Sequence, residues 1–131
     1  MRFEISHKSG KPPFLQIVEQ VQRAVAGGTL QPGARLPSLR DLAMQLRVNR
    51  NTVARAYNEL EHLGVVESQQ GLGVFVTHGG SRLSHAARMK EAREAMDAAI
   101  VQARHLGLSD EDFIQLAQTA LKDFNRNKGG K

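Results

Sequence analysis

Between Leu36 and Val76 the apolar residues of the chain change their spacing, from the period of a helix to the alternation of a strand. Two short helical stretches come first, at about residues 38–46 and 49–63, and they are separated by only two residues. A strand-like stretch follows at about residues 65–77 and is interrupted by glycines, which is typical of a hairpin. Two short helices with a tight turn, followed by a hairpin, predict a helix-turn-helix with a wing.

Capping residues mark the ends of the two predicted helices. Ser38, followed three residues later by Asp41, resembles a capping box at the start of the first helix. Asn49 is placed to cap the second helix, which Gly64 ends. A longer amphipathic helix is predicted upstream, between residues 13 and 27, because its apolar residues recur at steps of three and four.

The C-terminal part of the chain carries two further helical stripes of apolar residues. Gly107 separates them, and Ser109, followed by acidic residues, is placed to begin the second helix. Because two helices alone bury too little surface for a stable domain, the stripes are predicted to pack against a second copy of the chain. The residues expected to form this dimer surface are Met89, Met96, Ile100, Phe113, Ala117, Leu121 and Phe124.

These elements predict a fold that is mainly α with a small β-hairpin. An N-terminal winged helix-turn-helix is assigned to residues 1–78, and a two-helix dimerisation region to residues 79–131. The boundary is placed in a linker of small and polar residues that runs from Thr77 to Ser81. From Asn125 onward the sequence is polar and basic without an apolar period, so a short flexible tail is expected.

The composition narrows the choice of partners and location. The chain has 131 residues, with 18 Lys and Arg against 13 Asp and Glu and a formal net charge of +5. A basic protein favours an acidic partner, of which nucleic acid is the commonest. The absence of cysteine excludes disulfides and thiolate metal sites and fits a cytoplasmic protein. No apolar run is long enough to span a bilayer, so no membrane partner is expected.

The solvent side of the helix at about residues 49–63 is the predicted reading surface. The first turn of such a helix enters the major groove, where arginine can bind guanine and asparagine can bind adenine. The preceding helix and the wing glycines are expected to contact the phosphate backbone or the minor groove. The residues predicted to contact DNA are Arg40, Arg50, Asn51, Thr52, Arg55, Asn58, Gly71 and Gly73.

Each of these predictions has a structural alternative. The helix residues could be ordinary surface side chains, and Arg40 could form an ion pair with Asp41 or Glu61. Thr52 could hydrogen-bond a carbonyl of its own helix, as threonines often do. The two wing glycines could serve only to close the hairpin turn.

Three motifs together resemble the GntR family of transcriptional regulators. They are Leu36-Pro37-Ser38-Leu39-Arg40-Asp41-Leu42-Ala43, Val48-Asn49-Arg50-Asn51-Thr52-Val53-Ala54-Arg55-Ala56-Tyr57 and Gly71-Leu72-Gly73-Val74-Phe75-Val76. The match covers about residues 1–78, and the short two-helix C-terminal region is similar to that of the YtrA-like subfamily. The resemblance implies a homodimeric winged helix that binds a two-fold symmetric operator in double-stranded DNA, with Arg40, Arg50 and Gly73 at family DNA-contacting positions.

Two departures from the family pattern prevent the transfer of a base preference. Arg50 stands where many members of the subfamily carry proline, and Ala54 stands where other branches carry a second DNA-contacting arginine. Most of the wider family has a large ligand-binding domain after the wing, whereas the remaining residues here are mostly committed to two helices. A buried metabolite pocket is therefore not expected, and the sequence names no small-molecule effector.

Other classes of function are weighed against a sequence-specific repressor. An enzyme would need a nucleophile with its base, paired carboxylates or ligands at metal-binding spacing, and the sequence shows none of these patterns. No enzymatic activity, metal or cofactor is therefore expected. The alternative with the same fold is a nonspecific architectural DNA-binding protein or a protein-interaction module, which excess random duplex would distinguish from a specific regulator.

Overall fold

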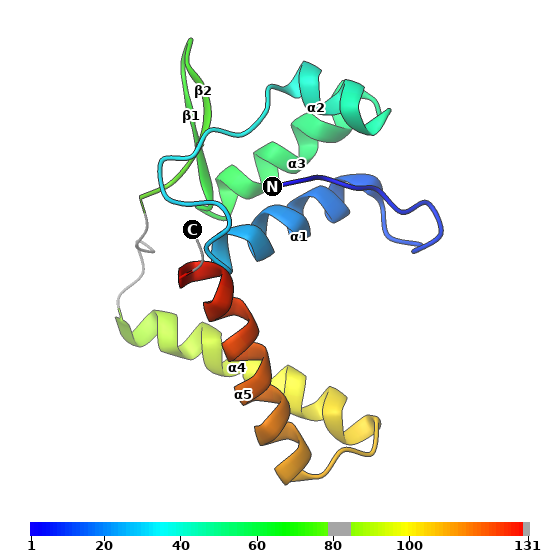
Figure 1. Cartoon of the computed structure of the whole chain (residues 1–131), viewed down its shortest axis with the longest axis vertical. Coiled ribbons are helices and arrows are strands. Elements are labelled where there is room, and N and C mark those ends of the chain that lie inside the picture. The colour runs from blue at the N-terminus through cyan, green and yellow to red at the C-terminus, as the bar shows by residue number, and fades with distance from the viewer. Residues whose placement is uncertain (79–84, 130–131) are drawn as a thin grey trace. The chain divides into compact units, whose positions relative to one another are not determined.

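The computed structural model describes residues 1–78 and 85–129. The chain divides into two units, whose elements are labelled in Figure 1. The elements of the first unit are α1 (Pro13–Ala26), α2 (Leu39–Leu46), α3 (Arg50–His62), β1 (Val66–Gln69) and β2 (Gly73–Val76). Those of the second unit are α4 (His85–His105) and α5 (Asp110–Gly129). The predicted fold class, mainly helical with a small hairpin, is confirmed.

Helix α3 is the centre of the first unit, because α1, α2 and β1 all contact it. One face of α3 is buried, and α1 contributes a matching face at helical spacing. The side chains from α1, α2, α3 and β1 in this core are Ile17, Val18, Val21, Leu42, Ala43, Val53, Ala56, Tyr57, Leu60 and Val66. The unit therefore has a single core, and the orientation of α3 is fixed by contacts on three sides.

The predicted caps of α2 and α3 are confirmed. Ser38 Oγ accepts a hydrogen bond from the Asp41 N–H at 3.0 Å, and Asn49 Oδ1 accepts one from the Asn51 N–H at 2.7 Å. Between the two helices, Arg47 has a φ of +58°, in the left-handed region. The sequence gives no sign of this conformation, because it favours glycine or asparagine and not arginine.

The hairpin pairs β1 and β2 antiparallel, with Val66 opposite Val76 and Gln69 opposite Gly73. The hairpin predicted at about residues 65–77 is confirmed, and its strands begin and end one residue inside those bounds. Val66 and Val76 are buried, whereas the residues of the turn are exposed. The hairpin is therefore attached to the core at its base only.

A third extended segment, which the sequence analysis did not predict, pairs with β2. Arg35 forms an antiparallel bridge with Phe75, and the Leu36 N–H donates to the Val74 carbonyl at 2.8 Å. The Val76 N–H donates to the carbonyl of residue 34, also at 2.8 Å. The segment is too short to show the alternating pattern of a strand in the sequence. In the structure it contributes Leu36, which is 2% exposed, to the core.

Two glutamines of α1 hold the N-terminal segment against that helix. The Gln16 side chain accepts from the Ser6 N–H and donates to the Ser6 carbonyl, both at 2.8 Å. Gln20 makes the equivalent pair of hydrogen bonds with the backbone of Glu4. The segment buries Phe3, which is 6% exposed. This contact was not predicted, because a glutamine on an amphipathic helix is normally expected to face solvent.

The turn between the two helices of the second unit lies where the sequence predicts. Gly107 has a φ of +79° after α4, and Ser109 caps α5. The Asp112 N–H donates to Ser109 Oγ at 3.1 Å, and the Ser109 N–H donates to Asp112 Oδ2 at 3.3 Å, which completes a capping box. None of the described helices combines the length and the apolar composition needed to cross a membrane.

The C-terminal helix is longer than expected. Helix α5 reaches Gly129 and so covers most of the segment predicted to be a flexible tail. Arg126 forms an ion pair with Asp123 at 3.2 Å, one helical turn away. Such pairs stabilise the end of α5, where the sequence has no apolar stripe. The last three residues of the predicted linker, 79–81, and the last two residues of the predicted tail lie outside the described residues.

Tyr57 makes the stability of the first unit depend on pH. Its hydroxyl donates to the Pro37 carbonyl at 2.7 Å, and its side chain is 4% exposed. Burial raises the pKa of the Tyr57 phenol above its ordinary value. A group with a raised pKa in the folded state stabilises the fold below its unfolded pKa, here about 10, and this stabilisation is lost as the pH rises further.

Tyrosinate absorbance reports on this residue alone, because the chain has one tyrosine and no tryptophan. We expect the absorbance to appear above about pH 10 only together with the loss of helical circular dichroism. The urea-unfolded protein is the control and should titrate near its ordinary pKa. If the folded protein titrates at the same pH as the control while its helices persist, the phenol is not buried.

Candidate nucleic-acid interface

Helix α3 has one side in the core and its first turn in solvent. In the view of Figure 1, α1 lies on one side of α3, whereas α2 and the hairpin lie on the other. Arg50 and Asn51 in the first turn and Asn58 further along are all exposed. The first turn has no acidic residue, so the partial positive charge of the helix N-terminus adds to that of Arg50. This surface favours a polyanion.

Arg40 and Arg50 are unpaired cations within the described part of the chain, where no ion pair includes either of them. Arg40 lies in the first turn of α2 and is exposed. Glu61, one of the partners considered for Arg40, instead accepts hydrogen bonds from the N–H and the hydroxyl of Ser68, each at 3.3 Å. Both guanidinium groups are therefore available to a phosphate or a base.

The hydroxyl of Thr52 is also available. Its backbone N–H donates to the Asn49 carbonyl at 3.0 Å, but among the described residues its side chain makes no hydrogen bond. The alternative in which Thr52 bonds a carbonyl of its own helix is therefore not observed. The half-buried position of Thr52 near the start of α3 suits a contact to the DNA backbone.

Arg55 differs from the other predicted contacts because its guanidinium contacts an aromatic ring. Its guanidinium carbon is 3.8 Å from the centroid of the Phe14 ring, so the side chain is stacked on α1. A cation over an aromatic face at this distance contributes about 0.5–1 kcal/mol at an exposed site. The contact with Phe14 therefore turns the Arg55 guanidinium toward α1, although Asn51 and Asn58 lie within one helical turn of Arg55. Arg50, Asn51 and Asn58 remain exposed.

The two predicted wing glycines have different surroundings. Gly71 has a φ of +78°, and a Cβ atom added there would meet nothing within 4 Å. Gly73 has a φ of +126°, and a Cβ atom added there would lie 2.9 Å from Arg35 Nε. Gly71 therefore serves the turn, whereas Gly73 also permits the close approach of an arginine. Leu72 between them is 61% exposed.

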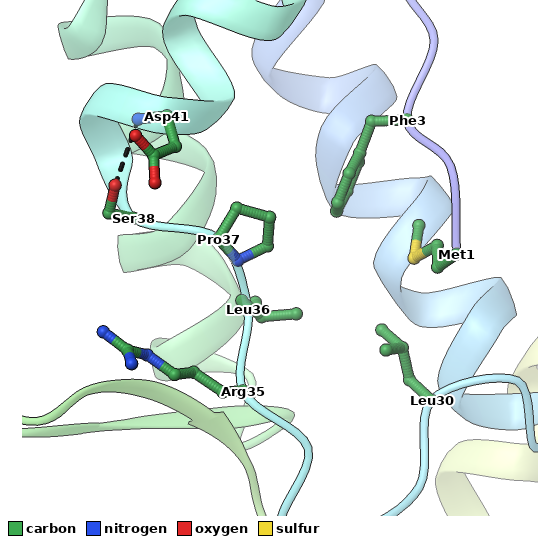
Figure 2. Close-up of a pocket in the computed structure, with 8 residues that line it drawn as sticks. All are labelled: Met1, Phe3, Leu30, Arg35, Leu36, Pro37, Ser38 and Asp41. Carbon is green, nitrogen blue, oxygen red and sulfur yellow. Dashed lines mark hydrogen bonds between the residues drawn. The ribbon is translucent and has the colours of Figure 1, made fainter.

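Arg35 was not among the predicted site residues. It lines a depression of about 470 Å³ beside the start of α2. In Figure 2 its side chain points toward the hairpin and away from Met1 and Leu30, which line the other side. A basic residue directly before the Leu36-Pro37-Ser38 motif was the available signal. Within the described residues, no group of three or more His, Cys, Asp or Glu side chains is placed to hold a metal ion.

The chain is similar in sequence to known regulatory proteins. The model of the gntR family of bacterial regulatory proteins matches residues 13–76. The chain is 30% identical to the HTH-type transcriptional repressor YtrA of Bacillus subtilis, over 98% of this chain and 96% of YtrA. The similar proteins are transcriptional regulators and not enzymes.

Solved structures agree with this relationship. The structure of a transcriptional antiterminator from Listeria monocytogenes has a TM-score of 0.79 and 33% identity, over 95% of this chain and 92% of that chain. A complex of the AraR DNA-binding domain with its operator ORE1 has a TM-score of 0.50 and 26% identity, over 59% of this chain and 94% of that chain. The second likeness is to a domain crystallised on operator DNA.

The separation of Arg50 from Arg55 on α3 predicts different effects of replacing them. Arg50→Ala should weaken binding to a duplex selected from a random library by about 1–3 kcal/mol and relax the preference at one base position. Arg55→Ala is the matched control, since it removes an exposed arginine from the same helix. It should leave the base preference unchanged and lower the thermal midpoint slightly.

The measurement is fluorescence anisotropy on the selected duplex and on a set of single-base variants of it. Equal effects of the two substitutions on base preference would show that the reading surface has been assigned to the wrong side of α3.

Proposed function

The chain belongs to the GntR family of bacterial regulatory proteins, and we propose that it is a cytoplasmic repressor that binds a two-fold symmetric operator as a homodimer. The family assignment makes it a DNA-binding transcriptional regulator. The observation that carries the proposal is the exposed first turn of α3, where Arg50 and Asn51 are free and no acidic residue opposes them. In the proposal, α3 enters the major groove and the hairpin lies near the adjacent minor groove.

Each side chain of the surface has a chemical role in this proposal. The fork of Arg50 matches the O6 and N7 atoms of guanine, and the amides of Asn51 and Asn58 match adenine. Arg40 and Thr52 bind phosphates and set the position of the protein on the duplex. Gly71 and Gly73 let the hairpin approach the sugar-phosphate backbone. Arg55 is assigned to the contact with α1 and not to base reading.

The second unit supports the homodimer, because it leaves most of its apolar surface in water. Of its described residues only Ala103 is buried. The two helices make few contacts with each other beyond the turn that joins them. An apolar groove of about 390 Å³ lies between them near that turn, with Met96, Ile100 and Phe113 in its lining. A pair of helices with an open apolar interior is marginally stable alone.

The proposed dimer surface contains residues of two kinds. Met89, Met96 and Leu121 are 57%, 45% and 62% exposed. Ile100, Phe113, Ala117 and Phe124 are half-buried within the single chain. A patch of large apolar side chains of this extent on a monomer favours association. A second copy of the chain offers the same apolar stripes, and pairing of identical surfaces gives a two-fold axis.

The two-fold axis determines what kind of operator fits. A dimer presents two α3 helices related by two-fold rotation, so it matches an inverted repeat whose half-sites are about one DNA turn apart. The assignment as a repressor is supported by similarity to YtrA of Bacillus subtilis along almost the whole of both chains. Any small-molecule effector is left outside the proposal.

Selection of bound duplexes from a random library tests the proposal, because the selection itself identifies the operator sequence. We expect the wild-type protein to enrich an inverted repeat and to bind it at least about a thousandfold more tightly than scrambled duplex. Leu121→Asp places a carboxylate in the proposed interface, where burial of an unpaired charge is costly. This variant should sediment as a monomer and enrich a single half-site with lower affinity.

Gln118→Asp is the matched control, since it places the same charge at another exposed position of α5. It should sediment and select as the wild type does. Transcription in vitro from a promoter that contains the selected repeat should decrease with the wild type and persist with Leu121→Asp. Selection of no common sequence would favour the architectural alternative, and unchanged sedimentation of Leu121→Asp would contradict the dimer surface.

A further inference from the structure

The backbone of Arg35 is fixed to the base of the wing. Its antiparallel bridge with Phe75, together with the hydrogen bond from the Leu36 N–H to the Val74 carbonyl, makes residue 35 part of the sheet. Successive side chains of an extended segment point to opposite faces. Because Leu36 points into the core and is 2% exposed, Arg35 points to the solvent face beside the hairpin.

The side chain of Arg35 lies against Gly73. A Cβ atom on residue 73 would come within 2.9 Å of Arg35 Nε and 3.4 Å of Arg35 Cζ, closer than two such groups can approach without displacement. The absence of a side chain at Gly73 thus leaves room for the guanidinium. The contact places the charged group over the strand that leads back from the wing.

Nothing in the described part of the chain neutralises this charge. Arg35 is exposed, and no ion pair among the described residues includes it. Asp41, in the first turn of α2, is the acidic side chain drawn in Figure 2, and it forms no ion pair with Arg35. A rigidly attached, solvent-accessible and unpaired guanidinium suits an external anion, because arginine matches the geometry of phosphate oxygens.

The position of Arg35 identifies which anion is within reach. Arg35 lies three residues before the cap of α2 and beside β2, and so connects the two parts of the first unit that are proposed to flank α3 on DNA. Where a recognition helix occupies the major groove and a wing approaches the minor groove, the sugar-phosphate backbone passes between them. A cation at this point meets a phosphate and not a base edge.

We propose that Arg35 is a further DNA-contacting residue, which binds a phosphate of the strand that passes between α2 and the hairpin, and that Gly73 sets its position. This inference rests on the proposed function, since it requires the same docking of α3 and the wing. Gly73 then has two roles: it lets the hairpin approach DNA, and it leaves space for the Arg35 side chain. The contact carries no base information, so it contributes equally to specific and nonspecific affinity.

Replacement of Arg35 gives a salt-dependence signature. Arg35→Ala should weaken binding to the selected duplex and to a scrambled duplex of equal length alike, by about tenfold. The slope of log affinity against log salt should become less steep by about 0.9 per protomer. Lys8→Ala is the control, because it removes an exposed cation from the loop before α1 and should leave the slope unchanged.

The outcomes separate this inference from the proposed function. Failure of the wild-type protein to bind any duplex more tightly than scrambled DNA would overturn the proposed function. Specific binding by the wild type with an unchanged slope for Arg35→Ala would overturn only the phosphate contact. A loss confined to one base position of the selected duplex would also overturn it, because Arg35 would then read a base.

A double-mutant cycle tests the role of Gly73. Gly73→Ala displaces the Arg35 side chain but also strains a backbone with a φ of +126°. Gly71→Ala is the matched control, since it strains a positive φ of +78° in the same turn with open space around the added carbon. In the wild type, Gly73→Ala should cost more affinity than Gly71→Ala. In the Arg35→Ala background the affinity cost of Gly73→Ala should fall while that of Gly71→Ala stays unchanged, and an undiminished cost of Gly73→Ala would show that Gly73 acts independently of Arg35.

Discussion

The first unit depends on the packing of one face of α3 against three other elements. Val53 and Leu60 are fully buried between α1, α2 and β1, and Tyr57 adds its hydrogen bond to the Pro37 carbonyl. A short helix that is polar on its other faces would not be stable in isolation, so these contacts determine both its existence and its direction. The backbone of the face left in solvent is consequently held in place.

The elements around α3 hold the remaining parts of the interface by the same principle. Glu61 ties the end of α3 to β1 through Ser68, and Tyr57 ties its middle to the residue before Ser38. Side-chain hydrogen bonds of α3 therefore hold both the segment before α2 and the hairpin in position relative to α3. The positions proposed to bind phosphate and those proposed to read bases are thus connected through one helix, which is how backbone contacts can set the register of base contacts.

Local features of the fold were predictable from the sequence, and contacts between distant residues were not. The periods of α1 and α3 and the caps Ser38 and Asn49 depend on residues within a few positions of each other. The stacking of Arg55 on Phe14 joins residues of two helices and leaves no trace in the spacing of either.

The same limit explains the other missed features. The extended segment that ends at Leu36 is too short for a period, and the backbone hydrogen bonds of Gln16 depend on where the N-terminal segment lies. The positive φ of Arg47 forms the left-handed cap at the end of α2, a position that usually carries glycine, so an arginine there offered no signal. For the dimer surface, composition indicated which residues are apolar, and only the structure distinguishes exposed Leu121 from half-buried Phe113.

DNA is proposed to meet the side of α3 that carries Arg50 and not the side that carries Arg55. Nitrogen-15 NMR of the arginine Nε–H groups, recorded during titration with the selected duplex, distinguishes the two sides. The resonances of Arg50 and Arg40 should shift and gain protection from exchange with water, while that of Arg55 should stay unchanged over Phe14. A shift of Arg55 with no change at Arg50 would contradict the proposal.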